Sequence, residues 1–491
     1  MGFTHPTLLI SPPDPRPLAL PALTNPLMPD TLFDAIEQTI SAQAKRHLTR
    51  KMTTDNPGPE SGSSTGITVA LQTVGCKLNQ AESEMLARRF ADAGFSVVTP
   101  EENPDVYILN TCTVTHIADR KCRQYLRAFH RKNPRALIVA AGCYAERDTD
   151  GVQVEGVNLT VNNKDKDDLV EIVESRLASR GISCNGDGYH ALSGPFRTRA
   201  MVKVQEGCAH ACSYCIVPRV RGRERSVTIE TILSEIKSRE QEGCKEIVLT
   251  GTRIGNWDGQ GGLEGLVRRI LEETAIPRIR LSSLQPRELS PALVTLWKVS
   301  DRVCQHLHLA LQSGCGATLE RMRREYSIGE YKAAVNMVRD AIPDIAITTD
   351  IIVGFPGETE DEFEESCRFC ERIGFANMHI FPYSLRTGTL AAKMPGKVPD
   401  KVKKSRSQRM LETAKQSSAA FRHKFKGEVM PVLWEERKSN NLWIGRTGNY
   451  MKVLTRSSHP LNNCLVPAKL GDEYQQGVWG EILPAEVSID G

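Results

Sequence analysis

The pattern of hydrophobic and polar positions changes at Ile67. From there to about residue 423, short apolar runs alternate with longer stretches in which apolar residues recur three and four positions apart. Short apolar runs bounded by turn residues predict buried strands, and the longer stretches predict amphipathic helices. Strands that alternate with helices pair in parallel, so the pattern predicts an α/β protein built on parallel sheets.

The α/β pattern divides into two regions. Over residues 66–180 the predicted strands are ITVALQ, VYILN, ALIVAAG and NLTV, and the predicted helices are 81–93, 115–131 and 165–179. After a polar bridge at 183–193, the region 194–423 has six strand candidates, MVKVQ, EIVLTG, RIRLSS, HLHLALQ, IAITTDIIVG and MHIFPYS. Helix patterns lie between these six candidates, and six βα repeats predict an open barrel.

The two ends of the chain depart from this pattern. Residues 424–486 hold five short strand candidates, EVMPVLWEE, NLWIGRT, YMKVLT, NCLVPAKL and VWGEIL, which predict a small β-barrel. Residues 1–65 are rich in Pro, Ser, Thr, Asn and Gly, with one helix-like patch at 31–43, and predict a disordered extension. Met52 is a second candidate translation start, and a chain that begins there keeps every motif described below.

The composition indicates in which kind of cellular compartment the protein works. The net charge of +4 is mild, so the whole chain does not indicate a polyanion partner, although local clusters could. The sequence has 14 Cys and no export signal, which favours a reducing compartment in which thiols stay free or bind metal. No apolar run reaches the roughly 18 residues that span a membrane, so we expect a cytoplasmic protein.

Three Cys at a C-x3-C-x2-C spacing, Cys208, Cys212 and Cys215, follow the predicted strand MVKVQ and precede a helix. A structural zinc site normally takes four ligands, and the imidazole within the motif, His210, has no following C-x2-C to accompany it. Three cysteines can instead hold a four-iron cubane whose fourth iron stays open and can chelate a small molecule. The spacing therefore favours an iron–sulfur cluster over zinc and over three buried free thiols.

Three further Cys each lie just past a predicted strand of the first region. Cys76 follows ITVALQ, Cys112 follows VYILN and Cys143 follows ALIVAAG. Loops that follow parallel strands gather at one edge of the sheet, so these residues can converge on a second three-thiolate site. The alternative is that each is an ordinary small core residue. Cys367 and Cys370 also form a C-x2-C, but they lie on the apolar side of a predicted helix, and we interpret them as core thiols.

Basic residues gather in two places that could contact nucleic acid. Four of them stack on one side of the predicted helix 115–131, namely Arg120, Arg123, Arg127 and Arg131. The C-terminal barrel offers aromatic side chains for base stacking, Trp434, Trp443, Tyr450 and Trp479, and cations for phosphate contacts, including Arg446 and Lys452. The alternatives are a solvated helix face in the first case and core aromatics in the second.

The Cys208 motif, with Tyr214 just before its last Cys, resembles the radical S-adenosylmethionine (SAM) superfamily. The resemblance implies a [4Fe–4S] cluster that cleaves SAM reductively to a 5′-deoxyadenosyl radical, which abstracts hydrogen from an unactivated carbon. The turns TGTRIG, SSLQPR, LQSG and VGFPGE end later strands of the predicted barrel and should line the SAM pocket. The candidate SAM contacts are Gly251, Thr252, Gln312 and Arg324.

The order of parts from Ile67 to Leu483 resembles the methylthiotransferases. The strings GCKLNQAESE at 75–84, NTCTVTHIADRK at 110–121 and AGCYAE at 141–146 look most like the branch that acts on N6-threonylcarbamoyladenosine in tRNA. The branch that modifies isopentenyladenosine usually carries Gln-Met after its first Cys, where this chain has Lys77 and Leu78. Further family-like strings are LHLALQSG at 307–314, TDIIVGFPGETEDEF at 349–363 and FPYSLRTGTLAAKM at 381–394.

The resemblance implies three domains. The first is a flavodoxin-like parallel-sheet domain at 66–180, with an auxiliary cluster on Cys76, Cys112 and Cys143. The second is an open (β/α)6 radical SAM barrel at 194–423, with the SAM cluster on Cys208, Cys212 and Cys215. The third is a TRAM-like RNA-binding barrel at 424–486. The implied cofactors are two [4Fe–4S] clusters and SAM. The implied partners are the tRNA anticodon loop, an electron donor such as flavodoxin or ferredoxin, and a sulfur donor. The implied reaction adds a methylthio group to carbon 2 of N6-threonylcarbamoyladenosine at tRNA position 37.

The sequence also departs from the family pattern. Ala310 stands where Pro is usual, Cys122 and Cys315 stand where Ser is usual, and Leu284-Gln285 stands where Ile-Glu is usual, which affects the SAM contacts expected near Gln285. Two alternative functions remain open at this point. One is methylthiolation of isopentenyladenosine in tRNA or of a ribosomal protein, and the other is a non-catalytic iron–sulfur protein that binds RNA.

Overall fold

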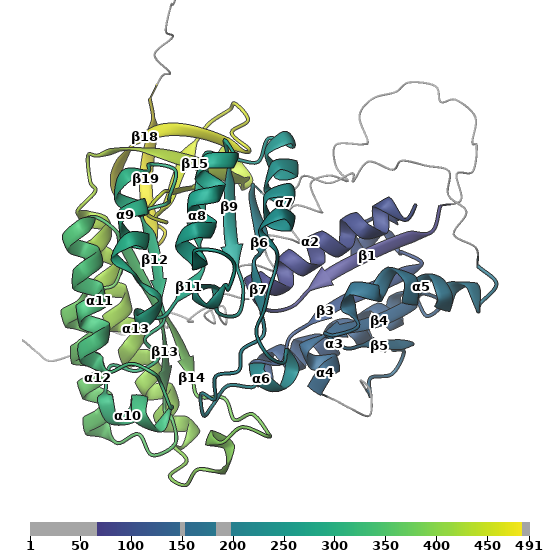
Figure 1. Ribbon diagram of the computed structural model, residues 1–491, viewed down its shortest axis with the longest axis horizontal. Helices are drawn as coiled ribbons and strands as arrows, with labels where there is room; N and C mark the ends of the chain where they lie inside the picture. The colour runs from purple at the N-terminus through teal and green to yellow at the C-terminus, as the bar shows by residue number, and fades with distance from the viewer. Residues whose placement is uncertain (1–65, 148–152, 183–197, 484–491) are drawn as a thin grey trace, which may run out of the picture. The chain divides into compact units, whose positions relative to one another are not determined.

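The computed structural model describes residues 66–147, 153–182 and 198–483, which belong to one compact unit (Figure 1). The extension 1–65, with its helix-like patch and Met52, and the polar bridge 183–193 lie outside the described residues. None of the helices in the described ranges combines the length and the hydropathy that a membrane span requires.

The first region forms a five-stranded parallel sheet with the order β2-β1-β3-β4-β5. Its strands are β1 (Thr68–Thr73), β2 (Ser96–Val97), β3 (Val106–Thr111), β4 (Leu137–Gly142) and β5 (Leu159–Val161). Its helices are α2 (Lys77–Asp92), α3 (His116–Lys132), α4 (Cys143–Arg147) and α5 (Leu169–Ala178), with 3-10 turns η1 (Pro100–Glu102) and η2 (Lys166–Asp168). Helix α3 packs on one face of the sheet, and α2 and α5 pack on the other. This strand order is that of flavodoxin-like sheets, so the predicted fold is confirmed.

Helix α2 begins at Lys77, with Cys76 as its N-cap residue, rather than at position 81 as the sequence pattern predicts. Its first turns bury polar side chains, Asn79, Glu82 and Ser83, where a core helix usually buries apolar ones. The hydrophobic period therefore does not mark the start of this helix.

Six parallel strand positions form the open barrel of the second region, and the predicted strand RIRLSS is divided into β10 and β11. The strands are β6 (Arg199–Lys203), β9 (Glu246–Thr250), β10 (Arg278–Leu281), β11 (Ser283–Leu284), β12 (His306–Leu309), β13 (Ala346–Val353) and β14 (Asn377–Pro382), with a small hairpin of β7 (Gln205–Glu206) and β8 (Arg225–Ser226). A bridge between Ile279 and Val303 continues the sheet from β10 toward β12.

Helices cover the outside of this barrel (Figure 1). They are α7 (Ile229–Gln241), α8 (Gly262–Glu273), α9 (Pro291–Val299), α10 (Gly316–Arg321), α11 (Ile328–Ala341), α12 (Glu360–Ile373) and α13 (Asp400–His423), with 3-10 turns η3 (Ile254–Asn256), η4 (Pro286–Glu288) and η5 (Ala391–Lys393). The short helix α6 (Val217–Val220) packs instead on Cys143, the first residue of α4. Cys367 and Cys370 of α12 are fully buried in the core beneath these helices, so their interpretation as core thiols is confirmed.

Helix α2 of the first region lies against the inner side of the barrel sheet. Ala200 and Val202 of β6 face the outer helices, whereas Met201 and its sheet neighbour Val248 face the opposite way and pack on Ala81. Since α2 begins at Cys76, this packing brings one edge of the first sheet toward the barrel interior.

The C-terminal region is a closed barrel with the order β15-β16-β17-β19-β18. Its strands are β15 (Val429–Arg437), β16 (Leu442–Thr447), β17 (Lys452–Arg456), β18 (Cys464–Tyr474) and β19 (Gly477–Ile482), with a 3-10 turn η6 (Ser439–Asn441). The five predicted strands are therefore present, but Trp434 and Trp443 are buried in the barrel core. The prediction that these two Trp offer surfaces for base stacking is wrong, because their rings fill the interior of a small barrel.

Candidate functional site

The carboxyl ends of three neighbouring strands bring Cys76, Cys112 and Cys143 together. Cys76 caps the helix after β1, Cys112 directly follows β3, and Cys143 is the first residue after β4. Gly75 has a φ of +122° and lies so close to Cys112 that a Cβ at position 75 would stand 2.6 Å from the Cys112 Cβ and 3.0 Å from its Sγ. A side chain at this position would push the first loop away from the second.

The three thiols act on one another electrostatically. Burial raises the pKa of Cys112 well above its ordinary value, and Cys76 and Cys143 raise it further. Burial also raises the pKa of Cys76, an effect that Arg221 partly offsets. Thiols with raised pKa values, such as those of Cys76 and Cys112, need a strong local positive charge to become thiolates, and a cluster of iron ions supplies it. None of the described Cys is in a disulfide, so this donor set fits a three-thiolate cluster.

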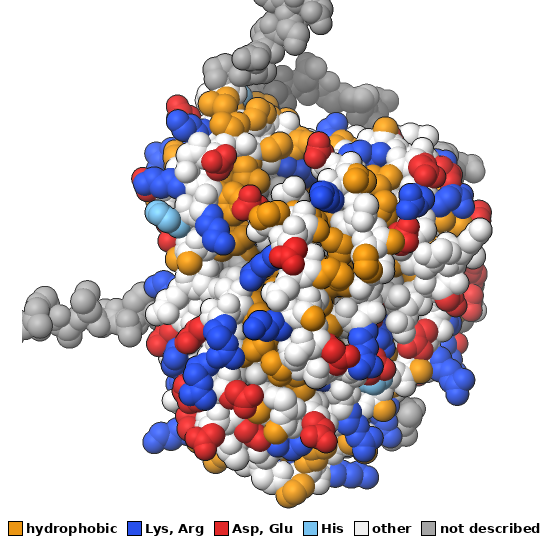
Figure 2. Space-filling model, turned by 60° about the vertical axis from the view of Figure 1, so that its left-hand side comes forward, with side chains coloured by type: hydrophobic (Ala, Val, Ile, Leu, Met, Phe, Trp, Pro, Cys, Tyr) orange, Lys and Arg blue, Asp and Glu red, His pale blue; other side chains and the backbone are white. Residues whose placement is uncertain are grey.

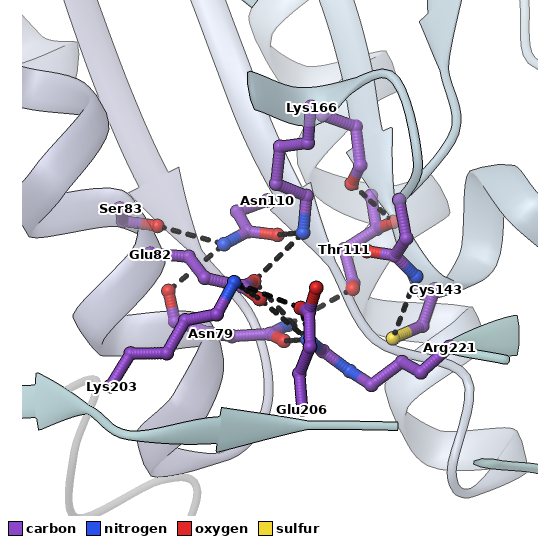
Figure 3. A network of polar contacts seen from close by, with 12 residues as sticks. Asn79, Glu82, Ser83, Asn110, Thr111, Cys143, Lys166, Lys203, Glu206 and Arg221 are labelled. Carbon is purple, nitrogen blue, oxygen red and sulfur yellow. Dashed lines mark hydrogen bonds and ion pairs between the residues drawn. The ribbon is translucent and has the colours of Figure 1, made fainter. Parts of the chain in front are cut away.

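A buried polar network lies beside this trio (Figure 3). Asn79 Nδ2 donates to the carbonyls of Val74 and Thr111 at 2.8 and 3.0 Å, and so ties the loop before Cys76 to the loop before Cys112. Asn110 Nδ2 donates to the Asn79 carbonyl at 2.9 Å, and Thr111 Oγ1 donates to the Ala141 carbonyl at 2.6 Å. These bonds hold the three Cys-bearing loops in one arrangement.

Glu82 occupies the centre of the network and is 2% exposed. Its carboxylate contacts Lys166 Nζ at 2.8 Å and Arg221 Nη1 at 2.7 Å, with Lys203 Nζ at 3.9 Å. Burial alone would raise the pKa of Glu82, but Lys166 and Arg221 outweigh burial and hold it well below its usual range. A permanently charged carboxylate therefore positions two cations from different parts of the chain.

Arg221 connects this network to the Cys208 motif. It follows the short helix α6, which begins two residues after Cys215, and its Nη2 donates to Asn79 Oδ1 at 2.6 Å. Ile216 and Val220 pack directly on Cys143. The segment that leaves Cys215 thus packs on Cys143 and links the second trio to the first.

Cys208, Cys212 and Cys215 lie half-buried in the loop between β7 and α6. The Cys215 N–H donates to the Cys212 carbonyl at 3.1 Å, and the Cys208 N–H donates to the Gly222 carbonyl at 3.0 Å, which closes the loop. Burial raises the pKa of Cys215 to about 12, with Cys212 and Cys208 contributing. As in the first trio, thiols with raised pKa values, here those of Cys208 and Cys215, suit a cationic cluster.

The four candidate SAM contacts lie on the loops that follow the barrel strands or beside the Cys208 motif. Gly251 and Thr252 follow β9, and the hydroxyl of Thr252 is buried without a partner. Gln312 follows β12 with a left-handed φ of +69° and is held by a backbone hydrogen bond to Asp350 at 2.8 Å. Arg324 Nη1 lies 3.1 Å from Cys212 Sγ, so it is the candidate that directly contacts the motif.

The candidate RNA contacts differ in exposure. On α3, Arg120, Arg127 and Arg131 are exposed, and the half-buried Arg123 lies 3.4 Å from the Tyr144 hydroxyl. In the C-terminal barrel Arg446 stands over the Tyr450 ring, and Lys452 Nζ donates to the Gln475 carbonyl at 3.3 Å. On the face shown in Figure 2, Lys and Arg are interspersed with Asp and Glu rather than gathered in one basic patch.

Several residues of the site have no separate signal in the sequence. Asn79 and Glu82 lie within the string 75–84 that resembles the family, but only the fold brings Arg221 to Glu82. Asp119 likewise joins the two regions, because its buried carboxylate contacts Arg386 Nη1 at 2.7 Å and Arg147 Nη1 at 2.6 Å. The polar residues Asn79 and Glu82, three positions apart on the buried side of a helix, are the signal that could have indicated such a network.

Two family descriptions match this chain. Residues 202–370 match the Radical SAM superfamily, and residues 68–161 match Uncharacterized protein family UPF0004. Among solved structures, the radical SAM methyltransferase TsrM from Kitasatospora setae, with cobalamin and a [4Fe–4S] cluster bound, has a TM-score of 0.52 at 16% identity. That match covers 67% of this chain and 77% of TsrM, and it shows a shared fold.

Curated relatives match almost along their whole length. The threonylcarbamoyladenosine tRNA methylthiotransferase MtaB of Bacillus subtilis is 34% identical to this chain. The alignment covers 86% of this chain and 98% of the MtaB chain. The MtaB of Aquifex aeolicus is 38% identical, and the alignment covers 77% of this chain and 97% of that MtaB. A tRNA-2-methylthio-N(6)-dimethylallyladenosine synthase of Acetivibrio thermocellus is 35% identical, and the alignment covers 84% of this chain and 90% of that synthase. With two adjacent Cys trios on a parallel sheet and an open barrel, the chain belongs to the methylthiotransferase family of radical SAM enzymes.

Proposed function

We propose that the protein adds a methylthio group to carbon 2 of N6-threonylcarbamoyladenosine at position 37 of tRNA. The observation that carries the proposal is that Ile216, directly after Cys215 of the second trio, packs on Cys143 of the first. A reaction that needs a radical centre and a sulfur source at one carbon requires two such sites next to each other.

Each trio has its own role in this proposal. Cys208, Cys212 and Cys215 hold the cluster that binds SAM, and Cys76, Cys112 and Cys143 hold a second cluster close to it. When bound, the first supplies reductive cleavage of SAM and the second supplies sulfur. Carbon 2 of adenine has neither an acidic proton nor a leaving group, so a radical route is needed.

The protein's own residues position these parts. Asn79, Glu82 and Arg221 hold the loops of the first trio against the segment that leaves the second. Arg324 contacts Cys212, and in this proposal it orients SAM. Gly251, Thr252 and Gln312 complete the proposed SAM site on neighbouring strand ends.

The tRNA anticodon loop is the proposed partner, since its bases can be unstacked to reach a buried site. The exposed arginines of α3 and the C-terminal barrel are the proposed phosphate contacts. The reaction also needs an electron donor such as flavodoxin or ferredoxin and a donor that restores the sulfur. Because the substrate is tRNA, we expect the protein to act in the cytoplasm.

The choice of substrate rests on two observations. MtaB relatives from several bacteria are 34–38% identical to the chain. The residues after Cys76 are Lys77 and Leu78 rather than the Gln-Met pair usual in the isopentenyladenosine branch. The second candidate is methylthiolation of isopentenyladenosine, which the relative from Acetivibrio thermocellus favours through its name and its 35% identity.

Nucleoside mass spectrometry of tRNA from a deletion strain tests the proposal. The methylthio derivative of threonylcarbamoyladenosine should disappear while the unmethylthiolated nucleoside accumulates. Loss of the isopentenyladenosine derivative instead would support the second candidate, and an unchanged digest would rule out both. Iron and sulfide counts on anaerobically purified Cys76→Ala and Cys208→Ala variants should show two independent losses.

A further inference from the structure

The segment after β3 and the loop after β14 meet around one buried carboxylate. Asp119 of α3 is 3% exposed, and its Oδ2 lies 2.7 Å from Arg386 Nη1 and 2.6 Å from Arg147 Nη1. Arg386 belongs to the loop after β14, and Arg147 is the last residue of α4. One carboxylate oxygen therefore serves two guanidinium groups, and the three side chains together keep a surplus of positive charge.

Arg386 is buried, and one of its three guanidinium nitrogens has no acceptor. Besides Asp119, its Nη1 contacts the Thr113 carbonyl, to which it donates at 3.0 Å, and its Nε donates to the Leu385 carbonyl at 3.1 Å. Its Nη2 finds no hydrogen-bond partner among the residues that the structure describes. A buried donor that is left unpaired is costly, and an anion that binds to it removes that cost.

The segments that meet here contain no second carboxylate that could serve as this acceptor. Asp119 is the only acidic residue in 113–132, and 383–394 contains none. In α4, Glu146 is already engaged, because its Oε2 accepts from the Asn163 N–H at 2.9 Å. The missing acceptor is therefore better supplied by a ligand than by a side chain of these segments.

Part of this group reaches solvent beside exposed apolar side chains. The Arg147 side chain is 30% exposed. Val114, directly after Thr113, is 48% exposed, and Ile117, two residues before Asp119, is 39% exposed. A nucleotide suits such a surface, because its base can pack on apolar side chains while its phosphate meets the cations. A small inorganic anion would use only the cations.

The loop that carries Arg386 also contacts both Cys motifs. Arg386 donates to the carbonyl of the residue that directly follows Cys112. Further along the same loop, the Ala391 N–H donates at 2.7 Å to the carbonyl of Ser213, the residue after Cys212. An anion bound by Arg386 is thus held beside the loops that carry the two motifs.

Resting on the proposed function, we propose that Arg386 and Arg147 bind an RNA phosphate next to nucleotide 37 of the tRNA. A base that leaves the stack turns about its own backbone, so the phosphates beside it have to be held while it enters the site. Arginine suits this role, because one nitrogen of its fork can donate to a phosphate while the other keeps Asp119. The competing ligand is the carboxylate of the threonylcarbamoyl group, and the experiment separates the two.

Fluorescence anisotropy with the cluster-loaded protein tests this inference. The probes are anticodon stem-loop RNAs with N6-threonylcarbamoyladenosine at position 37, each with one loop phosphate replaced by a neutral methylphosphonate. In the wild type, replacement of one phosphate next to nucleotide 37 should weaken binding about tenfold to a hundredfold, the range expected for a hydrogen bond to a charged group. Arg386→Gln should bind this RNA and the unsubstituted RNA equally well, while the other replacements keep their wild-type effects.

A second variant and a matched control accompany this measurement. Arg147→Gln leaves Asp119 its bond to Arg386, and it should reduce the effect of the same replacement. Arg406→Gln is the control, because Arg406 is also a buried arginine, with a 6% exposed side chain whose Nη1 lies 2.8 Å from Glu358 Oε2. Its loss should leave the wild-type pattern of effects intact. Urea unfolding midpoints show that the compared variants are folded.

The inference is overturned if Arg386→Gln responds to every replacement as the wild type does, or if no replacement next to nucleotide 37 weakens binding to the wild type. In the first case, a lost preference for threonylcarbamoyladenosine over plain adenosine at position 37 would assign Arg386 to the carboxylate instead. Failure of the proposed function is a separate result, in which the wild type shows the expected phosphate pattern yet leaves carbon 2 of the bound nucleoside unmodified when SAM and a reductant are added.

Discussion

Replacing Glu82 by Gln should destabilise the protein by about 3 kcal/mol, because one buried carboxylate serves two buried cations. Removing one partner of a buried ion pair costs about 3–5 kcal/mol, since it leaves an uncompensated charge. Gln keeps the shape of Glu but brings an amide donor where Arg221 and Lys166 already donate. Arg221 retains Asn79 Oδ1 at 2.6 Å, and Lys166 retains Asn110 Oδ1 at 3.2 Å, so we expect the lower end of the range.

Urea unfolding of the anaerobic, cluster-loaded protein measures this effect. With slopes of about 1–3 kcal/mol per molar urea, the midpoint should fall by about 1 M or more. Glu171→Gln, which removes an exposed carboxylate from α5, should stay within about 0.5 kcal/mol of the wild type. If the two variants unfold at the same midpoint, the carboxylate does not stabilise the network and the reasoning is wrong.

The difference in stability between the wild type and Glu82→Gln should depend on pH. The folded pKa of Glu82 lies below its ordinary value of 4.5, which approximates the unfolded chain. The stabilisation is therefore fully present above 4.5 and is lost as the pH falls through the folded pKa. The gap between wild type and Glu82→Gln should be constant near neutrality and should shrink below pH 4.5, whereas a gap that grows in acid would contradict the assignment.

Three further outcomes are expected. Cys112→Ala should lose roughly half of the iron yet still cleave SAM, whereas Cys367→Ala in the α12 core should keep its iron. Elemental analysis measures the iron, and the formation of 5′-deoxyadenosine measures the cleavage of SAM. Ultraviolet titration should detect one tyrosine with a midpoint of about 6 that is absent in Tyr450→Phe, and a midpoint near 10 would contradict the cationic surroundings. Arg127→Gln should weaken tRNA binding and reduce the slope of log K against log salt by about 0.7–0.9, whereas Arg268→Gln on α8 should change neither.

The strands and the Cys-bearing loops could be predicted because their signals are local. The strands β3 and β4 are buried along their whole length, so VYILN and ALIVAAG read as unbroken apolar runs. Parallel strands end at one edge, and this rule alone brings Cys76, Cys112 and Cys143 close together. The start of α2 could not be predicted from the apolar pattern, because the buried side of its first turns is polar.

The sequence by itself determined the order of elements, the two Cys trios and the resemblance to one family, since each depends on spacing along the chain. Only the tertiary structure decided which polar groups meet. Glu82 and Arg221 are 139 positions apart, and no local pattern pairs them. Alternation marks two faces of a strand but not which face a closed barrel encloses, so Trp434 could be assigned to the core only from the fold. The cations around the Tyr450 ring, Arg199, Arg280 and Arg446, come from separate strands and from the C-terminal barrel, so they meet only once those parts pack together.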